Sequence, residues 1–351
     1  RGESQMDDAG PRTDFSFCCG AATEVLKFGP TRFYSDRVAL IFCVIHTGNP
    51  GVVGFYRTFM QTLYSMFGCC HPVWAVSHAG HCEPPHSMDM VEGLQPSENS
   101  AKRDVFGLNG QIEHKLAFIR RHVPRETSLV LVGHSIGCYI ILDIMKRNPK
   151  LKIIKAVLLF PTIERMAETP QGKVMTPVLC HMRYLAYLPV FLLSLLPAAL
   201  QEGLIRLAFK MNRCDLFLFV VNAMYMGGQE MRTVMERDNI TIEKNIDKLL
   251  FYYGASDHWC PVQYYHDIKQ DFPRGNFRLC ENGFLSHQRY IILMFPVICP
   301  VHYPAVWSLR PRPDPPDPRQ HISYLTAVAH GVSQFPVTST IEQHLERLNR
   351  N

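Results

Sequence analysis

The stretch of sequence that decides the fold reads Leu129-Val130-Leu131-Val132-Gly133-His134-Ser135-Ile136-Gly137. An apolar, β-branched run over residues 128–132 predicts a buried strand, and residues 138–147 predict a helix after the Gly-x-Ser-x-Gly pattern. A serine on a sharp turn between a strand and a helix projects its hydroxyl group, and small flanking residues keep such a turn free of collisions. We therefore expect Ser135 to be a nucleophile. The alternative is a glycine-rich turn with an incidental serine.

Apolar runs and amphipathic segments alternate on both sides of this stretch. Strands are expected at residues 38–45, 72–77, 128–132, 155–160, 249–253 and 277–280, and helices at 55–66, 111–121, 138–147 and 262–271. Because the strands are apolar on both faces, they indicate a mostly parallel central sheet that helices cover on both sides, which is an α/β fold.

The alternation stops for about 85 residues after Pro161, which predicts an inserted helical cap. We expect core at 15–165 and 246–287, the cap at 166–245 and an atypical proline-rich tail at 288–351. Residues 184–200 of the cap carry no charge but are too short, and too interrupted by prolines, to span a membrane. This stretch either lies buried over the sheet or dips into a lipid surface. In the second case the lipid-contacting residues are Leu185, Val190, Phe191, Leu192 and Leu195.

Composition excludes several classes of protein. With 47% hydrophobic and 19% charged residues, the chain is neither disordered nor fibrous. The net charge of +5 is too diffuse for a nucleic-acid interface, but it suits an anionic membrane surface. The 12 cysteines form no Cys-x-x-Cys pattern, so we expect buried, reduced thiols in a cytosolic protein, with no metal site and no cofactor.

A nucleophilic serine needs a base and an acid, which follow it in the order Ser, acid, His in this fold class. Asp257 suits the acid because it follows the strand at 249–253; the alternative is a loop residue that caps the next helix. An oxyanion hole needs two backbone N–H groups. Ile136 is expected to supply one, and Gly48 or Asn49 the other, unless their loop is a mere tight turn.

Several strings, in this order, resemble the lipid droplet-associated hydrolase family of the α/β-hydrolase superfamily. The resemblance covers residues 15–280 and runs through Gly48-Asn49-Pro50-Gly51, Ser77-His78-Ala79-Gly80-His81, Gly107-Leu108-Asn109-Gly110-Gln111, Gly133-His134-Ser135-Ile136-Gly137, Phe160-Pro161-Thr162-Ile163-Glu164-Arg165-Met166, Gly227-Gly228-Gln229-Glu230, Tyr253-Gly254, Asp257 and Trp259-Cys260-Pro261. It implies an α/β-hydrolase fold and a serine hydrolase at lipid droplets and the cytosolic face of the endoplasmic reticulum. It also implies a lipid ester substrate, with sterol esters as the usual suggestion, Ser135 as nucleophile and Asp257 as acid.

The chain departs from the family's pattern near the catalytic histidine. The family carries it about six residues beyond the position of Cys280, and His287 lies within one residue of that place. Eight prolines between Pro296 and Pro318 exclude the regular helix that should follow, which suggests an altered C-terminus. His287 is our prediction for the general base, and His330, which precedes a helix expected at 340–350, is the alternative. If neither serves, the chain is a droplet-binding protein with impaired catalysis.

Overall fold

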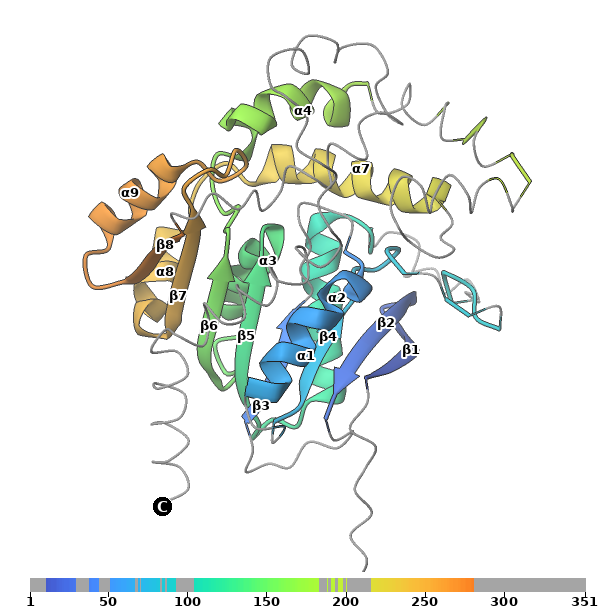
Figure 1. Cartoon of the computed structure of the whole chain (residues 1–351), viewed down its shortest axis with the longest axis horizontal. Coiled ribbons are helices and arrows are strands. Elements are labelled where there is room, and N and C mark those ends of the chain that lie inside the picture. The colour runs from blue at the N-terminus through green and yellow to red at the C-terminus, as the bar shows by residue number, and fades with distance from the viewer. Residues whose placement is uncertain are drawn as a thin grey trace, which may run out of the picture.

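The computed structural model describes residues 11–29, 38–43, 51–66, 69, 71–82, 84–85, 87–92, 104–182, 188, 191–192, 195–197, 200 and 216–280. An eight-stranded sheet forms the centre of the molecule (Figure 1). Its strands are β1 (Arg12–Cys18), β2 (Ala21–Phe28), β3 (Val38–Cys43), β4 (Val73–Val76), β5 (Ser128–His134), β6 (Ile153–Leu159), β7 (Leu249–Gly254) and β8 (Asn276–Cys280).

The strand order is β1-β2-β4-β3-β5-β6-β7-β8, and the six strands from β4 to β8 in this order run parallel. Every residue of β5 is buried, as expected of a central strand covered on both faces. The prediction of an α/β-hydrolase fold with a mostly parallel sheet is confirmed.

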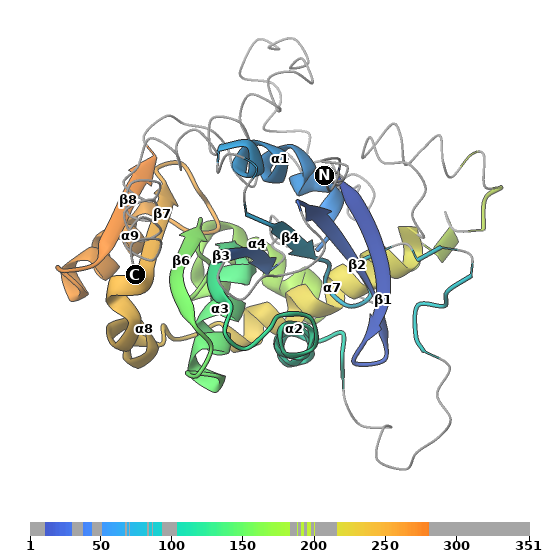
Figure 2. The same cartoon turned by 90° about the horizontal axis from the view of Figure 1, so that it is seen from below.

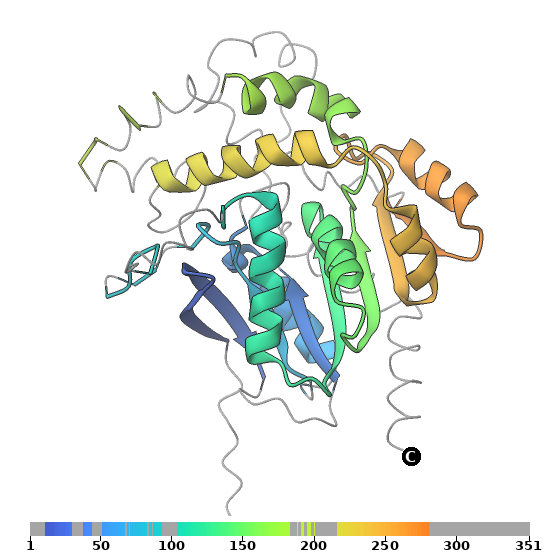
Figure 3. The same cartoon turned by 180° about the vertical axis from the view of Figure 1, so that it is seen from behind.

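Helices cover both faces of the sheet. They are α1 (Arg57–Met66), α2 (Leu108–His122), α3 (Ile136–Arg147), α4 (Pro170–Cys180), α7 (Leu216–Thr233), α8 (Asn239–Asn245) and α9 (Val262–Asp271), with short 3₁₀ turns at Val53–Tyr56, Met166–Glu168 and Ile246–Lys248. Helix α1 lies on one face and α2, α3 and α8 on the other (Figures 2 and 3). The buried residues Leu108, Ile112, Leu116 and Ile119 form one apolar stripe along α2, which is the reason this segment packs as a helix.

The antiparallel hairpin of β1 and β2 was not expected from the sequence. Cys18 pairs with Ala21 across a two-residue turn in which Cys19 and Gly20 have φ angles of 52° and 78°. Two positive φ angles give a turn whose twist matches the strands. Cys19 is exposed, as is Cys69, so the expectation that the thiols are buried is wrong at these two positions, although no disulfide joins any cysteines of the described residues.

The expected insertion between β6 and β7 contains α4, α7 and α8. Helix α7 lies between α4 and the edge of the sheet where the parallel strands end (Figure 1). Its polar side chains fix it to the core: Asn222 donates to the carbonyl of Gly80 at 2.7 Å, and the Gln229 carbonyl accepts from the N–H of Leu108 at 2.8 Å. The second bond satisfies a backbone N–H at the start of α2. Among the described helices, none is both long and apolar enough to cross a membrane.

Candidate functional site

Ser135 occupies the sharp turn between β5 and α3 that the sequence predicts. Its backbone has φ 56° and ψ −125°, a conformation that a residue other than glycine rarely adopts. The N–H of Ser135 donates to the carbonyl of Leu159 on β6 at 3.0 Å, which helps to hold the strained turn. Strain of this kind is retained where the surroundings enforce it, and it is common in active sites.

Gly133 has to be glycine because the first turn of α3 packs directly against it. A Cβ atom at this position would lie 2.8 Å from Cδ1 of Ile141 and 3.0 Å from the backbone nitrogen of Cys138. The first of the two glycines in the pattern therefore has a steric role. It lets the helix begin close to the strand, with Ser135 between them.

The side chain of Thr162 contacts the serine hydroxyl. The Oγ atoms of Ser135 and Thr162 lie 3.4 Å apart, and both residues are buried. Thr162 comes from the segment that follows β6, within the string Phe160-Pro161-Thr162. Sequence reasoning missed it, because only its position after the neighbouring strand could have pointed to it.

Asp257 lies in the loop after β7, where the sequence places it, and only 7% of its surface is exposed. Its Oδ1 atom accepts hydrogen bonds from the N–H groups of Trp259 at 2.8 Å and Cys260 at 3.2 Å. The residue before α9 is Pro261, and no side chain caps that helix. The alternative prediction, that Asp257 caps the next helix, is therefore wrong.

The sheet brings these loops to one edge. His134, Leu159 and Tyr252 lie side by side on β5, β6 and β7, so two strand spacings of about 4.8 Å separate the first from the third. The loops are also bonded to each other, because the Cys260 thiol donates to the carbonyl of Pro161 at 3.1 Å. Ser135 and Asp257 thus sit at the carboxyl ends of strands that are separated only by β6.

His134 packs beside the turn. Its Nδ1 atom lies 3.0 Å from the hydroxyl of Tyr56, and its ring stands perpendicular to that of Phe160, with the centroids 5.7 Å apart. These contacts describe a structural role.

One predicted donor of the oxyanion hole lies next to Ser135. Ile136 is the first residue of α3, and the first N–H groups of a helix have no partner within the helix and carry partial positive charge. Gly48 and Asn49 lie outside the described residues. Gly51, which follows their loop, donates its N–H to Nδ1 of His81 at 2.9 Å, and the ring of His78 leaves no room for a Cβ on it. Both histidines therefore contact Gly51.

Comparison with known proteins decides the family. The model of the family described as lipid-droplet associated hydrolase matches residues 38–288. The chain belongs to this family. A chicken (Gallus gallus) protein named lipid droplet-associated hydrolase is 51% identical, and the match covers 77% of this chain and 87% of the chicken protein. The human protein of that name is 46% identical, and the match covers 78% of this chain and 90% of the human protein. A serine hydrolase from Cycloclasticus zankles, at 14% identity, superimposes with a TM-score of 0.49 over 81% of this chain and 93% of its own.

The family match bears on the residues that the structure leaves out. It includes His287 and ends one residue later, so that His330 lies beyond it. Both histidines, together with Leu185 and Val190, lie outside the described residues. The other predicted lipid-contacting residues, Phe191, Leu192 and Leu195, are 46%, 55% and 65% exposed.

In this member of the family, ion pairs join the two ends of the cap. Glu164, after β6, accepts from Arg237, after α7, at 3.1 Å, and only 7% of each side chain is exposed. Arg165 forms an ion pair with Asp267 of α9 at 2.7 Å, and its N–H donates to the carbonyl of Met235. The cap therefore leaves and re-enters the core at one point, beside the segment that carries Thr162.

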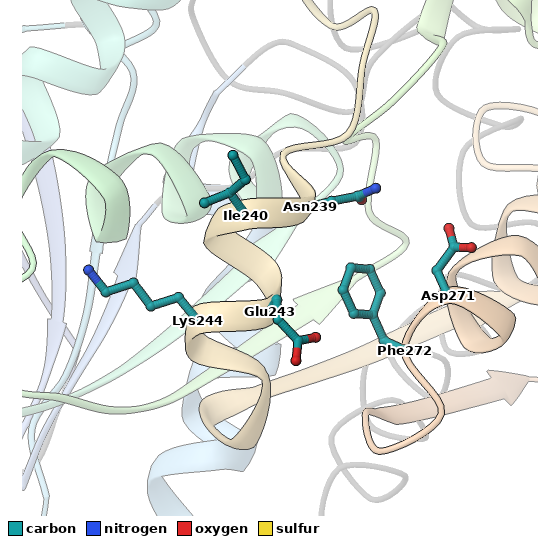
Figure 4. A pocket seen from close by; sticks show the side chains of 6 residues that line it. All are labelled: Asn239, Ile240, Glu243, Lys244, Asp271 and Phe272. Carbon is teal, nitrogen blue, oxygen red and sulfur yellow. The ribbon is translucent and has the colours of Figure 1, made fainter.

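A separate, open cavity of about 660 Å³ lies between α8 and α9 (Figure 4). It is lined by Asn239, Ile240, Glu243, Lys244, Asp271 and Phe272. None of these is a candidate catalytic residue. Among the described residues, no group of histidine, cysteine and acidic side chains has the arrangement of a metal site.

Proposed function

We propose that this chain is a serine hydrolase that cleaves the carboxylic ester bond of lipids, with Ser135 as nucleophile, Asp257 as acid and His287 as general base. The observation that carries the proposal is the backbone of Ser135. Its positive φ angle on a strand-to-helix turn is the conformation that presents a nucleophilic serine in α/β-hydrolases. Membership of a hydrolase family supports the same reaction class.

The proposed reaction proceeds in two halves through an acyl-enzyme. Oγ of Ser135 attacks the ester carbonyl carbon while His287 takes the hydroxyl proton, and the tetrahedral intermediate collapses as His287 returns this proton to the departing alcohol. A water molecule, activated by the same histidine, then attacks the acyl-serine and releases the fatty acid. The N–H groups of Ile136 and of Gly48 or Asn49 hold the oxyanion in both halves.

Asp257 is suited to hold the imidazolium charge that forms in each half. Two backbone N–H groups bind its Oδ1 atom and fix the carboxylate group in place. For the base, the inclusion of His287 in the family match favours it over His330.

We further propose that the exposed apolar residues of the cap bind a lipid monolayer. The relatives are named for lipid droplets, and Phe191, Leu192 and Leu195 expose apolar surface on the cap. Leu185 and Val190 belong to the same uncharged stretch. Droplets present such a monolayer, and the endoplasmic reticulum presents the cytosolic leaflet of its bilayer. The substrates that these surfaces would supply are neutral lipid esters, sterol esters among them.

The catalytic proposal is tested by ester hydrolysis with the purified full chain. Release of oleate from emulsified esters should fall to background in Ser135→Ala and in His287→Ala, whereas His330→Ala should retain activity. Thermal unfolding of each variant shows that it is folded. If the folded wild-type chain releases no more fatty acid than Ser135→Ala, the chain is instead the catalytically impaired droplet-binding protein.

The lipid-surface proposal is tested by flotation with artificial droplets of triolein coated with phospholipid. The double variant Leu192→Asp/Leu195→Asp should bind several-fold less than the wild type. Ile240→Asp is the control, since Ile240 is 83% exposed but lies on α8, outside the uncharged stretch at 184–200. Equal binding by all three proteins would show that the anchor lies elsewhere.

A further inference from the structure

Glu230 is a buried carboxyl group that the proposed mechanism does not use. It lies in α7, and only 1% of its surface is exposed. No side-chain hydrogen bond joins it to another described residue, and its Oε1 atom is completely buried without a partner. A buried polar group without a partner costs stability, so its presence calls for an explanation.

The contacts of Gly228 and Arg232 show toward which side of α7 the Glu230 side chain points. Gly228 and Arg232 face α4: the carbonyl of Gly228 accepts from the Cys180 thiol, and Arg232 donates to the carbonyl of Cys180 at 3.1 Å. Since each residue turns an α-helix by about 100°, Glu230 lies about 200° around the helix from Gly228. It therefore points away from α4.

The side of α7 opposite α4 faces the carboxyl edge of the sheet (Figures 1 and 3). Met226 and Val234, one turn before and one turn after Glu230 on this side, are fully buried. Ser135 lies at the same edge of the sheet, at the end of β5. Glu230 thus lies under the cap, on the side of α7 that faces the edge of the sheet where Ser135 lies.

The environment of Glu230 keeps its carboxyl group uncharged near neutral pH. Burial raises the pKa of Glu230 to about 8. A neutral carboxyl group offers one O–H donor and a carbonyl acceptor, the pair that a hydroxyl group complements. A ligand with only hydrocarbon at this place would leave the carboxyl group unpaired, whereas a hydroxyl would satisfy it.

We propose that Glu230 binds a free hydroxyl group of the substrate, so that the preferred substrates are lipid esters whose alcohol carries a second, unesterified hydroxyl. The inference rests on the proposed function, since it places this hydroxyl in the substrate of Ser135. It favours partial acylglycerols over sterol esters, whose alcohol has no hydroxyl left.

The experiment compares two esters of one fatty acid, monooleoylglycerol and propyl oleate, in the same mixed micelles. The wild type should prefer the glycerol ester. Glu230→Met, of similar size but apolar, should lower kcat/KM for this ester about tenfold and leave that for propyl oleate within twofold. Glu230→Gln, which keeps a donor and an acceptor, should retain most of the preference. Thr233→Ala, an exposed position on the same helix, is the control and should behave as wild type.

A binding measurement separates this inference from the proposed function. The uncleavable ethers 1-O-octadecenylglycerol and octadecenyl propyl ether are titrated into Ser135→Ala, with and without Glu230→Met, and the shift in melting temperature is recorded. The glycerol ether should bind more tightly, and Glu230→Met should remove the difference. The inference is overturned if Glu230→Met lowers the activity on both esters, or the affinity for both ethers, to an equal extent. It is also overturned if the preference for the glycerol compound is unchanged in this variant. If no ester is cleaved but the ethers still differ through Glu230, the proposed function fails and the binding site stands.

Discussion

The loop after β7 and the C-terminal part of α7 each bury one carboxyl group, and the two carboxyl groups have opposite surroundings. Asp257 receives two backbone N–H bonds on one oxygen atom. Glu230 receives none from the described residues, and burial raises its pKa to about 8. The first environment supports a negative charge, whereas the second opposes it. Carboxyl groups in such different surroundings take different roles: Asp257 is suited to orient a charged base, and Glu230 to offer a neutral hydrogen-bonding group.

The largest effect is expected from removing the charge of Asp257. Asp257→Asn keeps an oxygen that can accept the two N–H bonds, but it no longer stabilises the imidazolium, so kcat should fall by about 10³- to 10⁴-fold. Steady-state hydrolysis of a soluble ester measures it. Asp143→Asn is the control, because Asp143 forms an ion pair with Arg147 within α3 and should retain activity within about twofold. An equal loss of kcat in the two variants would show that Asp257 does not take part in the mechanism.

The contrasting prediction concerns stability and pH at Glu230. Because its pKa is raised in the folded state, folding takes up a proton between about pH 4.5 and 8, and the stability of the wild type falls as pH rises through this window. Glu230→Gln lacks this proton uptake. The free energy of unfolding of Glu230→Gln, measured relative to that of the wild type, should therefore rise by roughly 3 kcal/mol from pH 5 to 8.

Urea unfolding at several pH values measures this difference, with Glu236→Gln, an exposed carboxyl group beyond the end of α7, as control. The control difference should stay flat. A flat difference for Glu230→Gln as well would show that Glu230 is not held neutral, and the contrast with Asp257 would disappear.

A smaller effect is expected at the turn that carries the nucleophile. Gly133→Ala places a methyl group 2.8 Å from Ile141 and 3.0 Å from the backbone of Cys138, which should destabilise the fold by about 1–3 kcal/mol. At Gly54, the nearest atom to a new Cβ lies 3.9 Å away, so Gly54→Ala should be tolerated. Chemical denaturation ranks the two variants, and a tolerated Gly133→Ala would contradict the tight packing of this turn.

The smallest effect is expected at Thr162. Thr162→Val removes the hydroxyl that contacts Oγ of Ser135 at 3.4 Å, and the loss of one hydrogen bond should lower kcat three- to tenfold, with KM unchanged. Thr162→Ser should restore kcat. If Val and Ser variants have the same kcat, the hydroxyl does not position the nucleophile.

The sequence predicts the central strands well because each is a continuous apolar run. The strand expected at 249–253 is β7, Leu249–Gly254, and the helix expected at 262–271 is α9. The hairpin of β1 and β2 was missed, since its turn depends on a positive φ angle at Cys19, a residue that rarely adopts one. The position of β4 between β2 and β3 depends on pairing between strands distant in the chain, which no local pattern records.

Some residues of the candidate site could likewise be located from the sequence, and others could not. Ser135 and Asp257 could be located because each belongs to a local pattern at the end of a strand. Thr162 and Glu230 could not, because one depends on strand pairing and the other on the direction in which a buried helix faces. Residues whose role depends on packing between elements distant in the chain leave no local signal.

Every step of the proposed reaction depends on Ser135 being an activated nucleophile. Incubation of the full chain with a fluorophosphonate, followed by proteolysis and mass spectrometry, tests it directly because the reagent phosphonylates only activated serines. We expect one phosphonylated peptide, the one that contains Ser135. The adduct should be lost in Ser135→Ala and strongly reduced in Asp257→Asn. An unmodified Ser135 in the correctly folded chain, or an adduct at another serine that persists in Ser135→Ala, would contradict it.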